Sequence, residues 1–201
     1  MSAEVWRRAM LTGHRRLTAA DQDWVAGELA TVVGKLVVGH ATDTAISGLA
    51  LGADTIWAEV ALEAELELTA AIPYPSQCCD PTAPKHQTWT SEQQINWALL
   101  VSQSSKVLMV SDRDPTDYRE RVKMLHARND AMLKIADVCV AVWDEGNLRS
   151  GTSSCLRKAV SAGMPVILLN LKARKVRRPG PAWWSQALRV PTGQRWTAGA
   201  R

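Results

Sequence analysis

The feature that most constrains the fold is a regular alternation of short apolar segments with longer amphipathic ones. The short segments have the length and composition of buried strands, and they lie at residues 9–12, 44–47, 68–72, 106–110, 138–143 and 165–170. The segments between them repeat apolar residues with a helical period, at 19–36, 53–65, 91–103, 115–135 and 151–162. This order predicts an α/β protein with a doubly wound, mostly parallel sheet of about six strands, covered by helices on both faces.

The composition fits one soluble domain of 201 residues, because 46% apolar and 22% charged residues exclude a wholly disordered or fibrous chain. No stretch approaches the roughly 18 apolar residues of a membrane span, so we expect a cytoplasmic protein with no membrane partner. The cysteines form no CxxC pair and no spacing that suits zinc, so we expect reduced thiols and no metal site.

Charge is divided unevenly along the chain. Residues 172–201 contain eight basic residues and no acidic ones, and since the whole chain carries +4, residues 1–171 carry −4. We therefore predict a domain over residues 1–171 and a basic C-terminal tail over 172–201 that contains Pro and Trp. The tail could bind nucleic acid through phosphate charge and base stacking, or it could be a partly docked terminus whose tryptophans cover the body.

Gly- and Ser-rich turns follow three of the predicted strands, where the carboxyl ends of parallel strands meet. They lie at residues 12–16, 47–54 and 144–154. Such turns let the backbone approach a phosphate, and the free N–H groups at a helix start can bind it. The alternative is that each glycine only allows a tight turn. Neither GxxxxGK[ST] nor GxGxxG occurs, so ATP hydrolysis and dinucleotide redox chemistry are not favoured and no cofactor is predicted.

Six short motifs together carry a family resemblance. They read TGHR at 12–15, ISGLALGAD at 46–54, IPY at 72–74, RN at 128–129, AVWD at 141–144 and SGT at 150–152. In combination and order they resemble the SLOG superfamily, a Rossmann-like clan that includes the LONELY GUY phosphoribohydrolases, the DNA-processing protein DprA and YpsA-type bacterial and phage proteins, the last group being most similar. The resemblance spans roughly residues 9–171. It implies a nucleotide or nucleotide-derived ligand, and homodimers are common among such proteins.

The resemblance and the turns together define a set of candidate ligand-binding residues. We expect Arg15 and the SGT motif to hold phosphate, and Arg128 and Asn129 to orient ribose or base. The segment 73–89 is predicted to be a loop over the site, or else a disordered insertion, and the charged run at 112–121 is typical of a solvated face. The full set of candidates is Thr12, Gly13, His14, Arg15, Ser47, Gly48, Gly52, Asp54, Pro73, Tyr74, Arg128, Asn129, Ser150, Gly151 and Thr152.

Catalysis is left open by the sequence. The LONELY GUY motif PGGxGTxxE places carboxylates where Ser154 and Cys155 stand here, so cleavage of an N-glycosidic bond in the usual form loses support. Asp144 is the leading substitute, and Glu145 and Asp54 are the other candidates. Asp144 could instead only hold its turn, and Asp54 could instead only favour a helix N-terminus. Cys155 is more simply a core residue than a nucleophile.

Three functions therefore compete. The first is a nucleotide binder that acts as a sensor, carrier or sequestering protein. The second is a nucleotide N-glycosidase, phosphoribohydrolase or transferase, and the third is a DprA-like binder of single-stranded DNA.

Overall fold

Seven strands form one sheet in the computed structural model, which describes residues 4–189. The sheet order is β4-β3-β2-β1-β5-β6-β7, and all pairs are parallel except β6 with β7. The Rossmann-like α/β prediction is confirmed, with one strand more than expected. The strands are β1 (Arg8–Gly13), β2 (Thr44–Ser47), β3 (Glu67–Ile72), β4 (Lys106–Met109), β5 (Val138–Trp143), β6 (Val166–Asn170) and β7 (Lys175–Arg177).

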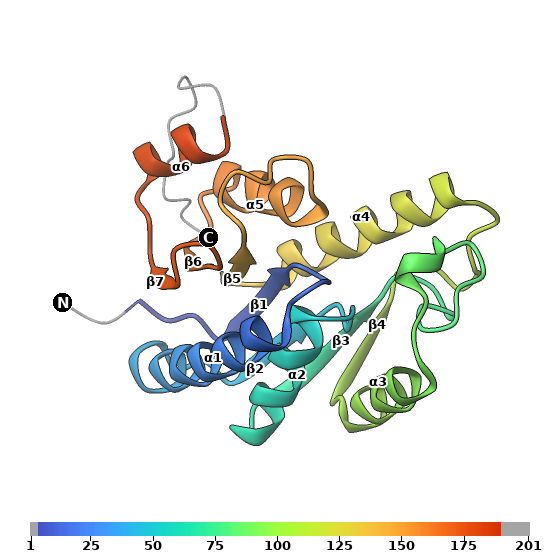
Figure 1. The fold of residues 1–201 in the computed structure, drawn as a ribbon. Helices are drawn as coiled ribbons and strands as arrows, with labels where there is room; N and C mark the ends of the chain where they lie inside the picture. Colours follow the sequence, from blue (N-terminus) through green and yellow to red (C-terminus); the bar gives the residue numbers. More distant parts are fainter. Residues whose placement is uncertain (1–3, 190–201) are drawn as a thin grey trace.

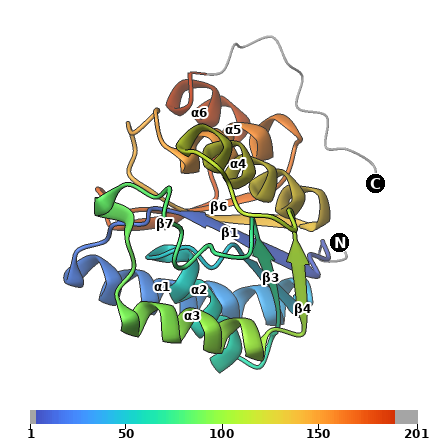
Figure 2. The same cartoon turned by 90° about the vertical axis from the view of Figure 1, so that its right-hand side faces the viewer.

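Helices cover both faces of this sheet (Figures 1 and 2). One face carries α1 (Ala19–His40), α2 (Ala53–Glu63) and α3 (Ser91–Gln103), and the other carries α4 (Tyr118–Ile135), α5 (Gly151–Ser161) and α6 (Pro181–Ala187). A 3-10 turn, η1 (Lys85–Gln87), lies in the loop before α3. Helix α4 begins at residue 118 instead of the predicted 115, because the Asp117 side chain accepts a hydrogen bond from the Glu120 N–H and caps the helix there.

The core is divided into two layers by the sheet. Alternate residues of β5 point to opposite faces, so Val140 packs with the α1–α3 layer whereas Cys139 and Ala141 pack with the α4–α6 layer. Every residue of β5 is buried. This explains why the sequence of β5 is a continuous apolar run and does not alternate.

The position of β1 determines where a ligand crevice can form. The chain passes from β1 outward through β2 and β3 to β4, and then returns along α4 to β5, which pairs with the other side of β1. The turns that follow β1 and β5 therefore diverge at the carboxyl edge of the sheet. In open α/β sheets this switch point is where ligands bind.

Residues 172–189 do not form a separate appendage. Strand β7 pairs antiparallel with β6, and the side chains of Trp184 and Leu188 are only 3% and 1% exposed in the α4–α6 layer. The predicted boundary after residue 171 thus falls within one sheet. Residues 190–201 of the predicted tail lie outside the described residues.

Three arginines of this segment contact acidic residues of the body. Arg174 pairs with Asp21 (2.5 Å), Arg177 with Glu145 (3.1 Å) and Arg178 with Glu4 (3.5 Å). The same arginines lie over the rings of Trp24, Trp183 and Trp6. Three of the eight basic residues that the sequence places after residue 171 are thereby paired with acidic groups. Within residues 4–189, no helix is both long and apolar enough to cross a membrane.

Candidate functional site

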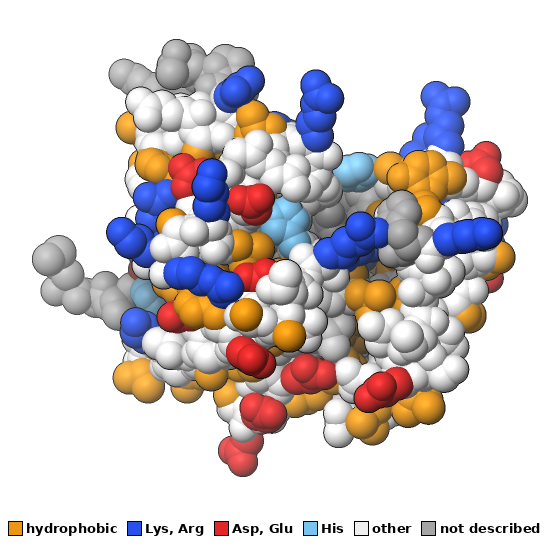
Figure 3. Space-filling view, viewed as in Figure 1, with side chains coloured by type: hydrophobic (Ala, Val, Ile, Leu, Met, Phe, Trp, Pro, Cys, Tyr) orange, Lys and Arg blue, Asp and Glu red, His pale blue; other side chains and the backbone are white. Residues whose placement is uncertain are grey.

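A pocket of about 410 Å³ opens at the carboxyl ends of β1 and β5. Its walls are the turn after β1, the start of α2, one side of α4 and the start of α5. Among the described residues, the lining includes four arginines and one carboxylate, Asp54. Figure 3 shows histidine side chains near the centre of the face seen in Figure 1, with basic side chains beside them. We call this cavity the arginine pocket; its arginines are Arg15, Arg121, Arg128 and Arg149.

Asp54 and Arg128 form a buried ion pair in the pocket wall. Nη1 of Arg128 lies 3.4 Å from Oδ2 of Asp54, and each residue is only 6% exposed. Burial raises the pKa of Asp54 and outweighs the opposite effects of Arg128 and Arg15. Nε of Arg128 is buried and has no hydrogen-bond partner within the described part of the chain. Asp54 thus does more than favour a helix N-terminus, because it is also the ion-pair partner of Arg128.

Gly48 makes room for this ion pair. A Cβ atom at residue 48 would lie 1.5 Å from Nη1 of Arg128 and 2.9 Å from Oδ2 of Asp54. Behind it, the Ser47 hydroxyl donates to the carbonyl oxygen of Asp54 (2.7 Å) and fixes the start of α2. These two residues therefore shape the pocket wall from behind instead of lining it.

The turn after β1 is held against the start of α2. The Ala53 N–H donates to the carbonyl oxygen of His14 (3.2 Å). Gly52 has a φ of +84°, and a Cβ there would lie 2.5 Å from the same carbonyl oxygen. Gly52 is therefore needed for a tight turn, which was the alternative interpretation of the glycines in the sequence, and it does not line the pocket.

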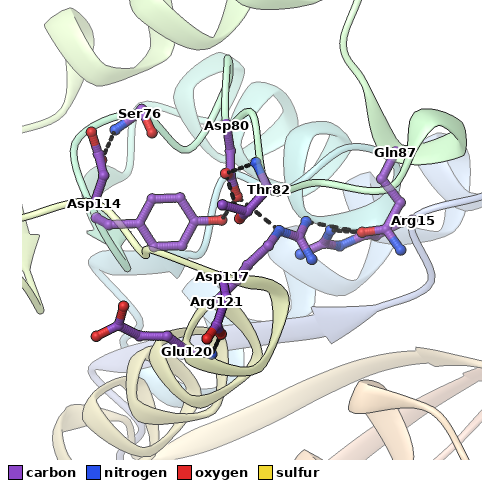
Figure 4. A network of polar contacts seen from close by, with 10 residues as sticks. Arg15, Ser76, Asp80, Thr82, Gln87, Asp114, Asp117, Glu120 and Arg121 are labelled. Carbon is purple, nitrogen blue, oxygen red and sulfur yellow. Dashed lines mark hydrogen bonds and ion pairs between the residues drawn. The ribbon is translucent and has the colours of Figure 1, made fainter.

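Arg15 and Arg121 share one acceptor from the loop before α3 (Figure 4). Nη1 of Arg15 and Nη2 of Arg121 both donate to Oε1 of Gln87, at 3.0 and 2.9 Å. Nε of Arg121 also donates to Oδ2 of Asp80 (2.8 Å). Burial lowers the pKa of Arg15 to about 10, and the nearby charges of Arg128 and Arg121 add to that effect. The arginine side chains are therefore crowded and incompletely neutralised.

The loop over residues 73–89 contributes Gln87 to the pocket, whereas Tyr74 and Gln77 do not line it. The Tyr74 hydroxyl donates to Asp80 (2.7 Å), and the Gln77 amide donates to the carbonyl oxygens of Gly48 (2.9 Å) and Leu49 (3.1 Å). Both side chains are buried. The side chains of Tyr74 and Gln77 therefore anchor the loop. The aromatic side chain that does line the pocket is Tyr118, which is 53% exposed.

The start of α5 presents backbone donors to the pocket. The Ser150 hydroxyl accepts from the Ser153 N–H (3.1 Å) and caps the helix, so it is already engaged. The N–H groups of Gly151 and Thr152 belong to the first turn, which has no intrahelical acceptors. One turn on, Cys155 is 1% exposed and burial raises its pKa to about 11. A buried thiol of this kind is a core residue, as the sequence suggested, and not a nucleophile.

Asp144 lies outside the arginine pocket. It is exposed and lines an adjoining, more open cavity of about 960 Å³, which shares His14, Arg15 and Gln87 with the pocket. Its backbone N–H donates to Nε2 of His14 (2.9 Å), so the neutral ring carries its proton on Nδ1. Burial lowers the pKa of His14, which favours this neutral form. The backbone N–H of Asp144 thus holds the ring of His14, and the assignment of Asp144 as a catalytic carboxylate stays a prediction.

The structure brings together most, but not all, of the predicted residues. Ser47, Gly48, Gly52, Pro73 and Tyr74 do not line the arginine pocket. The predicted residues that line it are Thr12, Gly13, His14, Arg15, Asp54, Arg128, Asn129, Ser150, Gly151 and Thr152.

Lining residues absent from the predicted set include Gln87, Tyr118, Arg121 and Arg149. Arg121 belongs to the charged run that was expected to be solvated, yet it is only 4% exposed. The charge pattern of residues 112–121 gives no signal that Arg121 is buried. The burial of Arg121 is explained by its ion pair with the buried carboxylate of Asp80. No group of three His, Cys, Asp or Glu residues in the described ranges is placed to hold a metal ion, and all four cysteines are free thiols.

The fold and the crevice define a Rossmann-like α/β protein, and two solved structures share this fold. DNA processing protein A (DprA) from Streptococcus pneumoniae superposes with a TM-score of 0.55 at 20% identity, over 81% of this chain and 50% of its own. DNA processing protein A from Helicobacter pylori, described for its single-stranded DNA binding mode, gives 0.56 at 20% identity, over 89% of this chain and 71% of its own.

The present chain therefore spans about half the length of the Streptococcus protein. No protein-family model and no curated protein matches the sequence. At 20% identity, these two structures show that the chain shares the Rossmann-like fold.

Proposed function

We propose that this protein binds a nucleotide or nucleotide-derived ligand through its phosphate in the arginine pocket, as a sensor, carrier or sequestering protein. The observation that carries the proposal is the charge of the lining, in which four arginines face one carboxylate among the described residues. That carboxylate, Asp54, is already paired with Arg128. The net positive charge in a partly buried cavity favours an anion.

The donors suit phosphate in particular. A guanidinium group offers a planar fork of N–H donors that matches phosphate oxygens, and Nε of Arg128 is a buried donor without a partner in the described chain. The first turn of α5 adds the N–H groups of Gly151 and Thr152 together with the positive end of the helix dipole. A volume of about 410 Å³ lies in the range of small-molecule sites. Tyr118 offers an exposed ring on which a base can stack.

A thermal-shift screen followed by titration calorimetry tests the proposal. The panel contains nucleoside mono-, di- and triphosphates, cyclic nucleotides and dinucleotides. For the best ligand, Arg149→Ala should weaken binding about tenfold, because a charge-assisted hydrogen bond to phosphate is lost. Arg119→Ala is the matched control, since Arg119 is also an exposed arginine but does not line the pocket. Equal affinity of the two variants, or no ligand in the panel, would overturn the proposal.

Arg128→Lys tests the buried donor separately. Lysine keeps the charge that Asp54 needs but lacks the planar fork, so the fold should survive while phosphate affinity falls at least tenfold. Wild-type affinity in this variant would remove Arg128 from the ligand site.

The same incubations test the enzymatic alternative. Mass spectrometry of each mixture would detect release of a base or sugar. The variants Asp144→Asn and Asp54→Asn would then test two of the candidate carboxylates separately. An intact ligand throughout supports binding without cleavage.

Single-stranded DNA is a second candidate, favoured by the fold shared with a DNA-binding DprA. Lys172 and Lys175 are exposed basic residues of the C-terminal segment and form no ion pair within residues 4–189. If this segment binds DNA, affinity for a fluorescent oligothymidine should fall steeply with salt, and Lys172→Ala with Lys175→Ala should reduce that salt dependence. Salt-independent or undetectable binding would refute the DNA proposal. Truncation after residue 171 is unsuitable, because it removes β7 and α6.

A further inference from the structure

We propose that the space between Arg15 and Arg121 is a second phosphate subsite, in which Oε1 of Gln87 holds the place of a phosphate oxygen. The ligand is then a nucleoside diphosphate, or a larger molecule with two linked phosphates, and not a monophosphate. This inference rests on the proposed function and specifies its ligand class.

The geometry around Gln87 is that of an anion site filled by a neutral group. One amide oxygen accepts from two guanidinium groups, at 3.0 Å from Arg15 and 2.9 Å from Arg121. Because arginine can only donate hydrogen bonds, the amide must turn its oxygen toward both of them. A charged phosphate oxygen is a stronger acceptor for the same two donors.

The positive charges of Arg15 and Arg121 are only partly balanced by the described residues. Among the described residues Arg15 forms no ion pair, and it lies close enough to Arg121 and Arg128 for both to repel its charge. Within residues 4–189, Arg121 has one carboxylate partner, Asp80, which it contacts through Nε and not through the Nη2 that faces Gln87. A group with negative charge between Arg15 and Arg121 would relieve this repulsion, and an amide does not.

The two subsites belong to one cavity. Arg15, Gln87 and Arg121 line the arginine pocket together with Arg128 and the start of α5. A ligand whose first phosphate meets Arg128 and the start of α5 can therefore place its second phosphate at Arg15 and Arg121. Gln87 lies at the end of η1, in the loop over residues 73–89, outside the strands and α-helices of the fold.

Gln87→Glu and Gln87→Ala give opposite tests of the subsite. Glutamate supplies a built-in anion between the two arginines, whereas alanine leaves both guanidinium groups open to a ligand. Gln103→Glu is the matched control: it makes the same change of charge at an exposed residue that does not line the pocket. The probes are the mono- and diphosphates of adenosine, guanosine, cytidine and uridine, titrated by calorimetry.

For the nucleoside that binds best, we expect the wild-type protein to hold the diphosphate at least tenfold more tightly than the monophosphate. Gln87→Glu should abolish this difference and raise the melting temperature above that of Gln103→Glu. Gln87→Ala should keep or enlarge the difference. The melting temperature also shows directly that each variant is folded.

Two failures are distinguishable. If monophosphates bind, but the second phosphate adds nothing and Gln87→Glu behaves like Gln103→Glu, the second subsite is refuted while the proposed function stands. If neither mono- nor diphosphates bind the folded wild-type protein, both this inference and the proposed function fail.

Discussion

Replacement of Gly48 by alanine should break the ion pair between Arg128 and Asp54. The added Cβ would lie 1.5 Å from Nη1 and 2.3 Å from Cζ of Arg128. Carbon and nitrogen atoms that are not bonded stay about 3.5 Å apart, so the guanidinium group must move by about 2 Å. The ion pair, already 3.4 Å long, cannot survive such a displacement. Asp54 would then remain buried in the first turn of α2 without its partner.

The expected cost follows from the burial of Asp54. Removing one partner of a buried ion pair destabilises a protein by about 3–5 kcal/mol, because the other charge stays out of water. We expect about 3 kcal/mol for Gly48→Ala at pH 7, since Arg15 still interacts favourably with the carboxylate. The pKa of Asp54, already raised by burial, should rise further when Arg128 moves away.

The cost of Gly48→Ala should depend on pH, and the shifted pKa of Asp54 determines the direction of that dependence. When the pKa of an acid is higher in the folded than in the unfolded state, the folded state binds more protons between the two values. Stability is then highest below the unfolded pKa and falls as pH rises through the folded pKa. The cost of Gly48→Ala should therefore be larger at pH 7 than near pH 4.

Urea unfolding at several pH values measures this cost, and a double-mutant cycle with Asp54→Asn identifies its origin. In the Asp54→Asn background, the additional cost of Gly48→Ala should be small and should not change with pH. A Gly48→Ala protein with wild-type stability would refute the reasoning, as would a cost that is independent of both pH and Asp54.

Three further predictions concern other parts of the fold. Gly52→Ala should lower the free energy of unfolding in urea by at least about 2 kcal/mol, because alanine is strained at a φ of +84° and would meet a backbone carbonyl oxygen. Gly27→Ala, which has open space around it in α1, should instead raise the free energy of unfolding by about 0.5–1 kcal/mol, and equal shifts in the two variants would contradict this reasoning. Trp184→Ala should destabilise the protein by about 3 kcal/mol by leaving a cavity under α6, and an unchanged unfolding midpoint would show that α6 is not docked in solution. Iodoacetamide at pH 8 should label the exposed Cys79 in the native protein but not the buried Cys155, whose pKa is about 11. Peptide mass spectrometry identifies the labelled cysteine, and labelling of Cys155 but not Cys79 would contradict this prediction.

The sequence was most informative about the parallel strands. The bounds of β2 and β5 agree with the predicted ranges because polar or glycine residues end each apolar run, and the order of elements determined the sheet class. Strand β7 was missed because its three residues, Lys175–Arg177, have exposed basic side chains and no apolar period. Its structure depends on pairing with β6, which is a tertiary effect.

In the candidate site, too, local sequence signals predicted some residues, whereas others depend on tertiary packing. Residues that follow β1, β2 and β5 in sequence were predicted because strand ends converge in any parallel sheet. Arg121 and Gln87 were missed because α4 and the loop over residues 73–89 bring them to the pocket from the side. Their positions depend on how these segments pack across the sheet, which the local pattern of charge and hydropathy does not encode.

The central position of β1 has a consequence for how the chain folds during synthesis. The N–H of Arg8, at the start of β1, donates a hydrogen bond to the carboxylate of Asp137, which lies 129 residues later in the chain. Strand β5 begins at the next residue. Until β5 has been made, β1 is the open edge of a four-stranded half-sheet with unpaired backbone groups. Contacts of such long sequence separation form slowly, and exposed edges attract other strands. The stage most vulnerable to aggregation is therefore the interval between completion of β4 and emergence of β5.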